Sequence, residues 1–220
     1  MSKSLVVVGT GLFAEVAAAY FNKYTEYTTV AYACHASYKE SDSVYGLPLV
    51  AIESLTESHP ADTHDVFVAV GYNQMNQMRA RIYQEIKDMG YTCPTFVHPN
   101  VEIWGSTRLG DNVFIFEDNT IQPFTSIGSN TMLWSGNHIG HHSSIGSHCF
   151  IASHVVISGS CKVDNYCFIG VNATLRDSIT IAEKTLIGAG ALIMKNTKPK
   201  EVYVEGPTRP FKKNSEEIDF

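Results

Sequence analysis

The stretch "LWSGNHIGHHSSIGSHCF", residues 133–150, places an aliphatic side chain at every sixth position. Leu133, Ile139 and Ile145 lie within it, and the rule extends outward from Val97 to Ile193 over seventeen successive positions. This period matches neither an α-helix nor a simple alternating strand, and it is typical of a β-helix solenoid. Each hexad would supply one short strand and one corner, so that three hexads form one triangular coil.

The residue three positions after each aliphatic side chain is mostly Asn, Asp, His or Ser. These residue types tolerate a positive φ or bond their own backbone, so we expect the corners of the coils there. Phe124, Tyr166 and Lys184 are exceptions in residue type. Three of the five cysteines fall one position later, in a column of small residues, where we expect them to pack inside the coils: Cys149, Cys161 and Cys167.

The first 96 residues follow a different pattern, in which apolar strands alternate with helices. We expect strands in "SLVVVGTG" (4–11), "TTVAYACH" (28–35) and "DVFVAVGY" (65–72). Helices are expected in "LFAEVAAAYFNKY" (12–24) and "NQMNQMRARIYQEIKDMG" (73–90). Such alternation predicts a small, Rossmann-like α/β domain with a parallel sheet.

A GxGxxA turn, formed by Gly9, Gly11 and Ala14, lies at the expected start of helix 12–24. Backbone N–H groups at a helix N-terminus can receive a phosphate. In a dinucleotide site an acidic residue would follow near the end of the second strand, whereas this sequence has His35 there. The motif therefore favours a nucleotide diphosphate group over a complete NAD site.

The bulk composition excludes several classes of partner. The net charge is −6, and the basic residues are scattered, so no nucleic acid is expected to bind. No apolar stretch is long enough for a membrane span or a signal peptide. The five cysteines form no CxxC pair and are odd in number, which suits a reducing compartment. We therefore expect a cytoplasmic protein that does not bind a membrane.

The repeats "IGSNTM", "IGHHSS" and "IGSHCF" resemble those of the hexapeptide-repeat acyltransferases, whose fold is the left-handed parallel β-helix. With "VVVGTGLFAE", "GLPLV", "VFVAVGYNQMNQMR" and "FVHPNVEI" included, the whole chain is similar to sugar acetyltransferases of the NeuD and PglD type. This resemblance implies a nucleotide-sugar-binding domain over 1–96, a β-helix with an acetyl-CoA site over 97–198, and a tail over 199–220. It also implies a homotrimer.

The resemblance further implies acetyl transfer from acetyl-CoA to an amine of a nucleotide-linked amino sugar, commonly at C4, for a surface glycan of the O-antigen kind. In the family frame "IGHHSSIG" places the catalytic base at His141, while Gly140 and His142 occupy positions where the family often has carboxylates. Imidazole suits this role because its ordinary pKa, about 6.5, lies close to neutrality. His142 is therefore a second catalytic candidate, although it also falls in the corner column with His148 and His154.

Further binding residues are implied by the same resemblance. The candidates for the nucleotide-linked sugar are Gly9, Gly11, His35, Gly71 and Tyr72, with His138 as a residue of the acceptor groove. The candidates for acetyl-CoA are Gly170, Val171, Gly188, Ala189 and Pro207, along a groove between neighbouring β-helices.

Three alternatives stay open at the level of sequence. The acceptor could be a sugar hydroxyl, as in sialic acid modification, because a single sequence does not display the acceptor pocket. Hexapeptide β-helices of the γ-carbonic anhydrase type hold zinc with histidines, but those proteins lack the α/β domain, and we expect no metal here. A non-catalytic scaffold is the third alternative.

Overall fold

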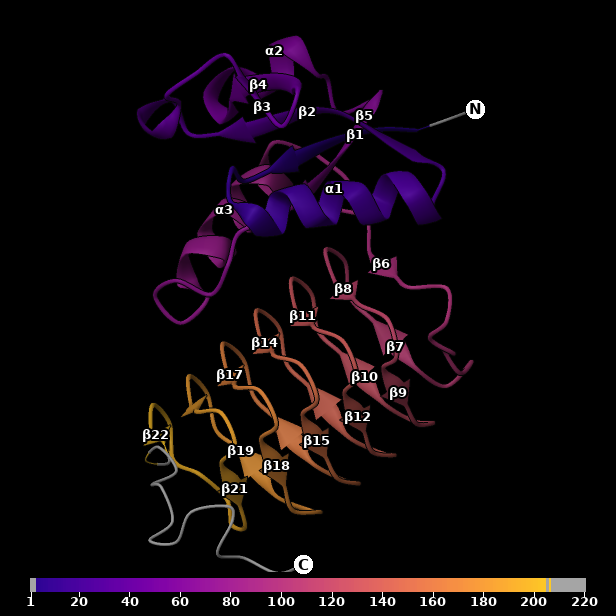
Figure 1. The fold of residues 1–220 in the computed structure, drawn as a ribbon, viewed down its shortest axis with the longest axis vertical. Helices are drawn as coiled ribbons and strands as arrows, with labels where there is room; N and C mark the ends of the chain where they lie inside the picture. The colour runs from indigo at the N-terminus through magenta and orange to yellow at the C-terminus, as the bar shows by residue number, and fades with distance from the viewer. Residues whose placement is uncertain (1–2, 205, 207–220) are drawn as a thin grey trace, which may run out of the picture.

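The computed structural model describes residues 3–204 and 206, which form an α/β domain and a β-helix (Figure 1). The elements of the α/β domain are β1 (Lys3–Val8), α1 (Leu12–Tyr24), β2 (Tyr27–Cys34), β3 (Ser43–Val44), β4 (Leu47–Ala51), α2 (Leu55–Ser58), β5 (His64–Val68) and α3 (Gln77–Asp88), with short 3-10 helices at Ala36–Tyr38 and Ile52–Ser54. The sheet order is β3-β4-β2-β1-β5, and every pair except β3 with β4 is parallel. The predicted Rossmann-like domain is therefore present.

The helix predicted over 73–90 begins only at Gln77. Gln74, Met75 and Asn76 have φ values of 55°, 52° and 63°, so the chain makes a left-handed turn before the helix starts. The expectation was wrong at this end because the sequence pattern does not reveal left-handed backbone at Gln74 and Met75, whose residue types usually favour helices.

Seventeen two-residue strands follow in the second part of the chain, and they stack in three parallel sheets. One sheet holds β6 (Phe96–Val97), β8 (Phe114–Ile115), β11 (Met132–Leu133), β14 (Phe150–Ile151), β17 (Phe168–Ile169), β20 (Leu186–Ile187) and β22 (Val202–Tyr203). The second holds β7 (Arg108–Leu109), β10 (Ser126–Ile127), β13 (Ser144–Ile145), β16 (Lys162–Val163) and β19 (Thr180–Ile181). The third holds β9 (Thr120–Ile121), β12 (His138–Ile139), β15 (Val156–Ile157), β18 (Thr174–Leu175) and β21 (Leu192–Ile193). The predicted left-handed β-helix fold class is thus confirmed.

The hexad rule describes both the interior and the corners of these coils. The aliphatic side chains from Ile115 to Ile193 are buried and pack on one another inside the coils. Twelve of the corner residues have a positive φ between 50° and 64°, and these include Phe124, Tyr166 and Lys184. The corner conformation is therefore more regular than the residue types suggested. Ile103 is the one exception to the interior rule, because it lies outside any strand and is 36% exposed.

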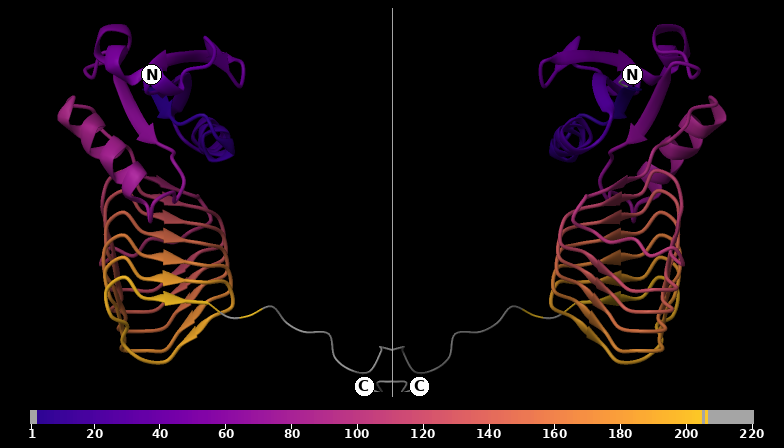
Figure 2. Two further views of the ribbon diagram at one scale, coloured as in Figure 1. Left: turned by 90° about the vertical axis from the view of Figure 1, so that its left-hand side faces the viewer. Right: turned by 90° about the vertical axis from the view of Figure 1, so that its right-hand side faces the viewer.

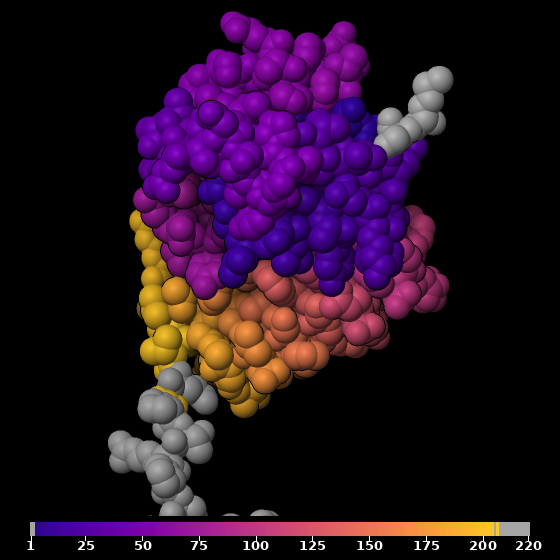
Figure 3. Space-filling model, turned by 45° about the horizontal axis from the view of Figure 1, so that its top comes forward, coloured from indigo at the N-terminus to yellow at the C-terminus, as the bar shows by residue number. Residues whose placement is uncertain are grey.

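The first coils are covered by the α/β domain (Figures 2 and 3). Aromatic side chains project from the outer face of the sheet that contains β8, and Phe96, Phe114 and Phe116 pack against Phe21 and other residues of α1. Figure 3 shows the α/β domain lying against the β-helix, and on this face it leaves the later coils uncovered. The burial of these rings joins the two parts of the chain into one core.

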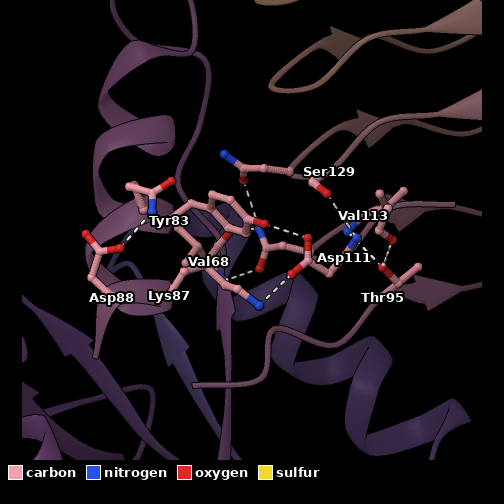
Figure 4. A network of polar contacts seen from close by, with 12 residues as sticks. Val68, Tyr83, Lys87, Asp88, Thr95, Asp111, Val113 and Ser129 are labelled. Atoms are coloured by element: carbon pink, nitrogen blue, oxygen red, sulfur yellow. Dashed lines mark hydrogen bonds and ion pairs between the residues drawn. The ribbon is translucent and has the colours of Figure 1, made fainter. Parts of the chain in front are cut away.

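Polar contacts complete the joint on the side of α3 (Figure 4). Tyr83 donates a hydrogen bond to Asp111 Oδ1 at 2.5 Å, and Lys87 Nζ lies 2.8 Å from Asp111 Oδ2. The side chain of Asn112 accepts from the backbone N–H of Val68 at 2.8 Å and donates to its carbonyl at 3.2 Å. The end of β5 is therefore fixed to a corner of the β-helix.

His148 is a half-buried member of this joint. Its ring stacks on Tyr166 at 4.8 Å and meets Tyr83 edge-on at 5.8 Å. Burial, with a smaller contribution from the Arg79 guanidinium, lowers the pKa of His148 to about 4. The imidazole is therefore neutral in the folded protein at pH 7.

Acid should destabilise the fold through this residue. The unfolded chain takes up a proton at His148 as the pH falls below about 6.5, whereas the folded protein does so only near pH 4. Stability is thus lost as the pH falls from 6.5 to 4. We expect His148→Asn, which tolerates the left-handed corner, to reduce the fall in Tm between pH 7 and pH 5 by about 2 °C or more. The control variant His154→Asn, at an exposed corner, should show the same fall in Tm with pH as the wild-type protein. If Tm depended on pH equally in all three proteins, the low pKa assigned to His148 would be contradicted.

Candidate functional site

A cavity of about 600 Å³ lies at the carboxyl end of the parallel sheet in the α/β domain. Its walls come from the ends of β1, β2 and β5, the start of α1 and one face of α3. Because β1 lies between β2 and β5, the loops after β1 and β5 leave the sheet at the point where the strand order reverses. Sheets of this kind bind ligands at that point, and the volume suits a nucleotide.

Gly9 and Gly11, the candidates for binding the nucleotide-linked sugar, line this cavity, and each has a distinct structural reason to be glycine. Gly9 has a φ of 135°, and a Cβ there would lie 2.6 Å from the carbonyl oxygen of Ala69. Gly11 is the N-cap of α1 in an extended conformation, and no atom lies within 4 Å of the position of its absent Cβ. The open space and the N–H groups at the start of the helix suit a phosphate group.

His35 and Gly71 also line the cavity, whereas Tyr72 is not among its lining residues. The Nδ1 and Nε2 atoms of His35 lie 3.6 Å from Glu53 Oε1 and 3.4 Å from Glu85 Oε2. Backbone hydrogen bonds, from Glu53 itself and from Ala36, lower the pKa of Glu53. Glu53 is therefore a charged carboxylate beside His35, which occupies the position where a dinucleotide site would have an acidic residue.

The wall opposite α1 contains residues that sequence analysis did not identify. Asn73, Met78 and Arg81 line it, and Arg81 donates to Gln74 Oε1 at 2.8 Å. Tyr72 instead packs its ring against Phe150 and Phe168 on the β-helix, 4.9 Å from each ring centre. No repeat or motif in the sequence identified Arg81 as a cavity residue. Its side chain lines the cavity because it lies in α3 one helical turn after the left-handed residues 74–76.

His141 and His142 lie together at the corner between β12 and β13. Their Nδ1 atoms are 3.1 Å apart, and the ring of His142 also packs against Phe124 at 4.8 Å. His138 lies on β12, with its side chain on the outer face because Ile139 points inward. His142, His148 and His154 occupy three different corners, in agreement with the hexad pattern.

Two neighbours of His141 were not identified from sequence. The backbone N–H of His141 donates to Gln122 Oε1 at 2.8 Å. A Cβ at Gly159 would lie 2.9 Å from both Cε1 and Nε2 of His141, so glycine at that position leaves room for the imidazole ring. Gly159 stands one coil after His141, and the eighteen-residue repeat seen in the strand pairs could have located it.

The residues expected to contact acetyl-CoA lie on the last coils. Gly170 and Gly188 follow β17 and β20 directly, and Val171 is 43% exposed beside Gly170. A Cβ at Gly170 would lie 2.6 Å from the backbone nitrogen of Ala189, so glycine lets the two coils approach. Pro207 lies outside the described residues.

Within residues 3–204 and 206, no three His, Cys, Asp or Glu side chains cluster closely enough to hold a metal ion. No helix in that same part of the chain has the length and apolar character needed to cross a membrane.

Comparison with known proteins places the β-helix in a family. The sequence matches the GMPPB C-terminal domain over residues 91–202, just over half of the chain. The chain belongs to the GMPPB C-terminal domain family. The region matched by the GMPPB C-terminal domain includes the complete run of hexads. No curated protein matches the chain by sequence.

Solved structures similar to this member of the GMPPB C-terminal domain family also contain the α/β domain. One is a mutant of perosamine N-acetyltransferase from Caulobacter crescentus in complex with CoA and GDP-perosamine, with a TM-score of 0.82, 23% identity, and coverage of 90% of this chain and 92% of that chain. A second is the acetyltransferase domain of PglB from Neisseria gonorrhoeae FA1090, with a TM-score of 0.79, 21% identity, and coverage of 95% and 100%. A third is WeeI from Acinetobacter baumannii AYE, with a TM-score of 0.61, 18% identity, and coverage of 94% and 99%. The expected two-part fold is therefore shared along almost the whole chain.

A negative charge at the N-terminus of α1 should weaken ligand binding without lowering the thermal stability of the protein. Asp is a favourable N-cap, and Gly11 has an extended backbone with open space, so Gly11→Asp should leave Tm unchanged or raise it. The carboxylate would repel a phosphate at the same place. We expect the Kd for UDP, dTDP or GDP, whichever binds, to rise at least about tenfold relative to the neutral control Gly11→Asn. Calorimetric titration measures this, and equal affinities of the two variants would contradict a phosphate site at Gly11.

Proposed function

We propose that the protein transfers an acetyl group from acetyl-CoA to the amine of a nucleotide-linked amino-dideoxy sugar. We place the amine at C4 of the sugar, the reaction in the cytoplasm, and the product in the synthesis of a surface glycan. The observation that carries the proposal is the nucleotide-sized cavity at the N-terminus of α1, joined by a buried aromatic interface to a β-helix with a histidine at an open corner.

The structural neighbours support this choice of reaction. Perosamine N-acetyltransferase, a neighbour over nine tenths of the chain, is described in complex with CoA and GDP-perosamine. The acetyltransferase domain of PglB is described in complex with acetyl coenzyme A. Two forms of the perosamine enzyme carry a histidine replaced by asparagine or alanine. We therefore propose acetyl-CoA and a nucleotide-linked amino sugar as the two substrates here.

The chemistry requires one proton acceptor. The sugar amine attacks the thioester carbonyl, and the resulting tetrahedral intermediate expels the CoA thiolate. The attacking nitrogen must lose a proton, and we propose that His141 Nε2 accepts it. Backbone N–H groups at the glycine-rich corners would stabilise the oxyanion.

His142 has a proposed role in orienting this base. A hydrogen bond between the two Nδ1 atoms, which are 3.1 Å apart, requires one ring to donate and the other to accept. When His141 donates from Nδ1, its Nε2 carries a free lone pair and faces the space above Gly159. Sugar acetyltransferases of the NeuD and PglD type often have a carboxylate at this position. His142 would thus take its place as the partner that fixes the tautomer of His141.

The position of His141 in the coil favours a site shared between chains. The α/β domain covers the sheet that contains β8 and β11, whereas His141 lies at the corner between the other two sheets. The cavity and the base of one chain therefore face different sides of its β-helix. We propose a homotrimer in which His141 of one chain serves the nucleotide pocket of its neighbour, with acetyl-CoA between them along Gly170 and Gly188.

An assay of thiol release tests the function directly. We expect wild-type protein to release free CoA with at least one UDP-, dTDP- or GDP-linked 4-amino-4,6-dideoxyhexose, and His141→Asn to lower kcat at least about tenfold while CoA binding persists. Loss of one general base costs roughly 10²- to 10⁴-fold in rate, so residual turnover is consistent with the role. Turnover of hydroxyl sugars alone, or near-native kcat in His141→Asn, would contradict the proposal.

A further inference from the structure

Arg79 is a fully buried cation that has no carboxylate partner among the described residues. It lies on α3 where this helix meets the β-helix, and its side chain has no exposed surface. Burial lowers its pKa to about 10, so the guanidinium remains charged at neutral pH. Across residues 3–204 and 206, no Asp or Glu forms an ion pair with it. A buried charge of this kind is costly unless many hydrogen bonds compensate it, and its retention calls for a specific role.

The hydrogen bonds of Arg79 divide into two groups. On the side of the α/β domain the acceptors are Val70 O at 3.4 Å, Gly71 O at 2.9 Å and Asn76 Oδ1 at 3.1 Å. On the side of the β-helix they are Asn130 O at 3.3 Å and Cys149 O at 3.0 Å. The side chain of Asn76, also fully buried, extends the second group by donating to Cys167 O at 3.2 Å. Together the two side chains connect one loop to the same corner of three successive coils.

That loop, residues 70–76, forms part of the wall of the cavity. Val70, Gly71 and Asn73 line it. The loop then takes the left-handed turn at Gln74, Met75 and Asn76, closed by a hydrogen bond from Asn76 N to Tyr72 O at 3.1 Å. Left-handed backbone costs roughly 1 kcal/mol or more for each such residue, so the surrounding contacts must hold it in place. Strained backbone of this kind clusters at ligand sites.

We propose that Arg79 is a positioning residue for the nucleotide pocket. Its planar guanidinium, with donors directed to both sides, holds loop 70–76 against the β-helix and thereby fixes one wall of the cavity. This inference rests on the proposed function, because it assigns the wall to the nucleotide-linked sugar. The loop packs on the ring of Phe168 in β17, whereas Gly170 and Gly188 lie beyond the ends of β17 and β20, so we expect the effect of Arg79 to be confined to one substrate.

The test compares Arg79→Lys with wild-type protein. Lysine keeps the charge but is shorter and lacks the fork of donors, so it cannot reach both groups of acceptors. We expect KM for the nucleotide-linked sugar to rise about tenfold, while kcat and KM for acetyl-CoA stay within about twofold. Amide hydrogen exchange in loop 70–76 should become faster, since the loop loses its connection to the coils. Asn76→Gly, which keeps the left-handed backbone but removes the side chain, should act in the same direction and serves if Arg79→Lys does not fold.

Tyr83→Phe is the matched control. It removes a hydrogen bond between α3 and Asp111 in the same joint, but Tyr83 does not contact loop 70–76 through it. We expect a lower Tm with unchanged KM and unchanged exchange in the loop. An increase in KM equal to that of Arg79→Lys, or unchanged loop exchange in Arg79→Lys and Asn76→Gly, would overturn the proposal. If the wild-type protein acetylates no amino sugar, the proposed function is overturned. Hydrogen exchange in loop 70–76 still tests the positioning role of Arg79 in that case.

Discussion

The stacking of aliphatic side chains inside the β-helix, one above another in successive coils, is the interaction on which the rest of the structure depends. Each coil repeats the same three strands, so Leu133 lies beside Ile115 and Ile151, and the buried aliphatic side chains form one continuous core. This register requires a left-handed residue at nearly every corner, whatever its side chain. It also requires glycine where coils approach closely, as at Gly170 beside Ala189. The β-helix is therefore a rigid support with fixed columns of side chains on its surface.

The α/β domain contacts two of these columns of side chains. Aromatic rings on the sheet that contains β8 bind α1, and corner residues such as Asp111 and Asn112 bind α3 and the end of β5. These contacts fix the nucleotide-sized cavity relative to the coils. His141 lies at a corner that neither contact reaches, which is why we propose that a second chain completes the active site.

The regular features could be predicted from sequence, and the irregular ones could not. The hexads located the strands, the corners and the separation of the histidines, because a repeated local pattern determines each of them. The glycine turn located Gly9 and Gly11 in the cavity for the same reason. By contrast, the left-handed turn at Gln74 to Asn76 and the burial of Arg79 depend on contacts with coils many residues away. Ile103 departs from the repeat because no strand forms around it. Tertiary contacts of this kind leave no local pattern in the sequence.

The central claim is that the base and the nucleotide pocket of one active site belong to different chains. Co-expression of His141→Asn and Gly11→Asp chains with two tags would give mixed trimers, each with at most one interface that combines an intact pocket with an intact His141. About three quarters of randomly assembled trimers contain both chains, and one interface in three is complete in each, so we expect about a quarter of the wild-type rate of CoA release. Activity no greater than that of the two separate variants would contradict it.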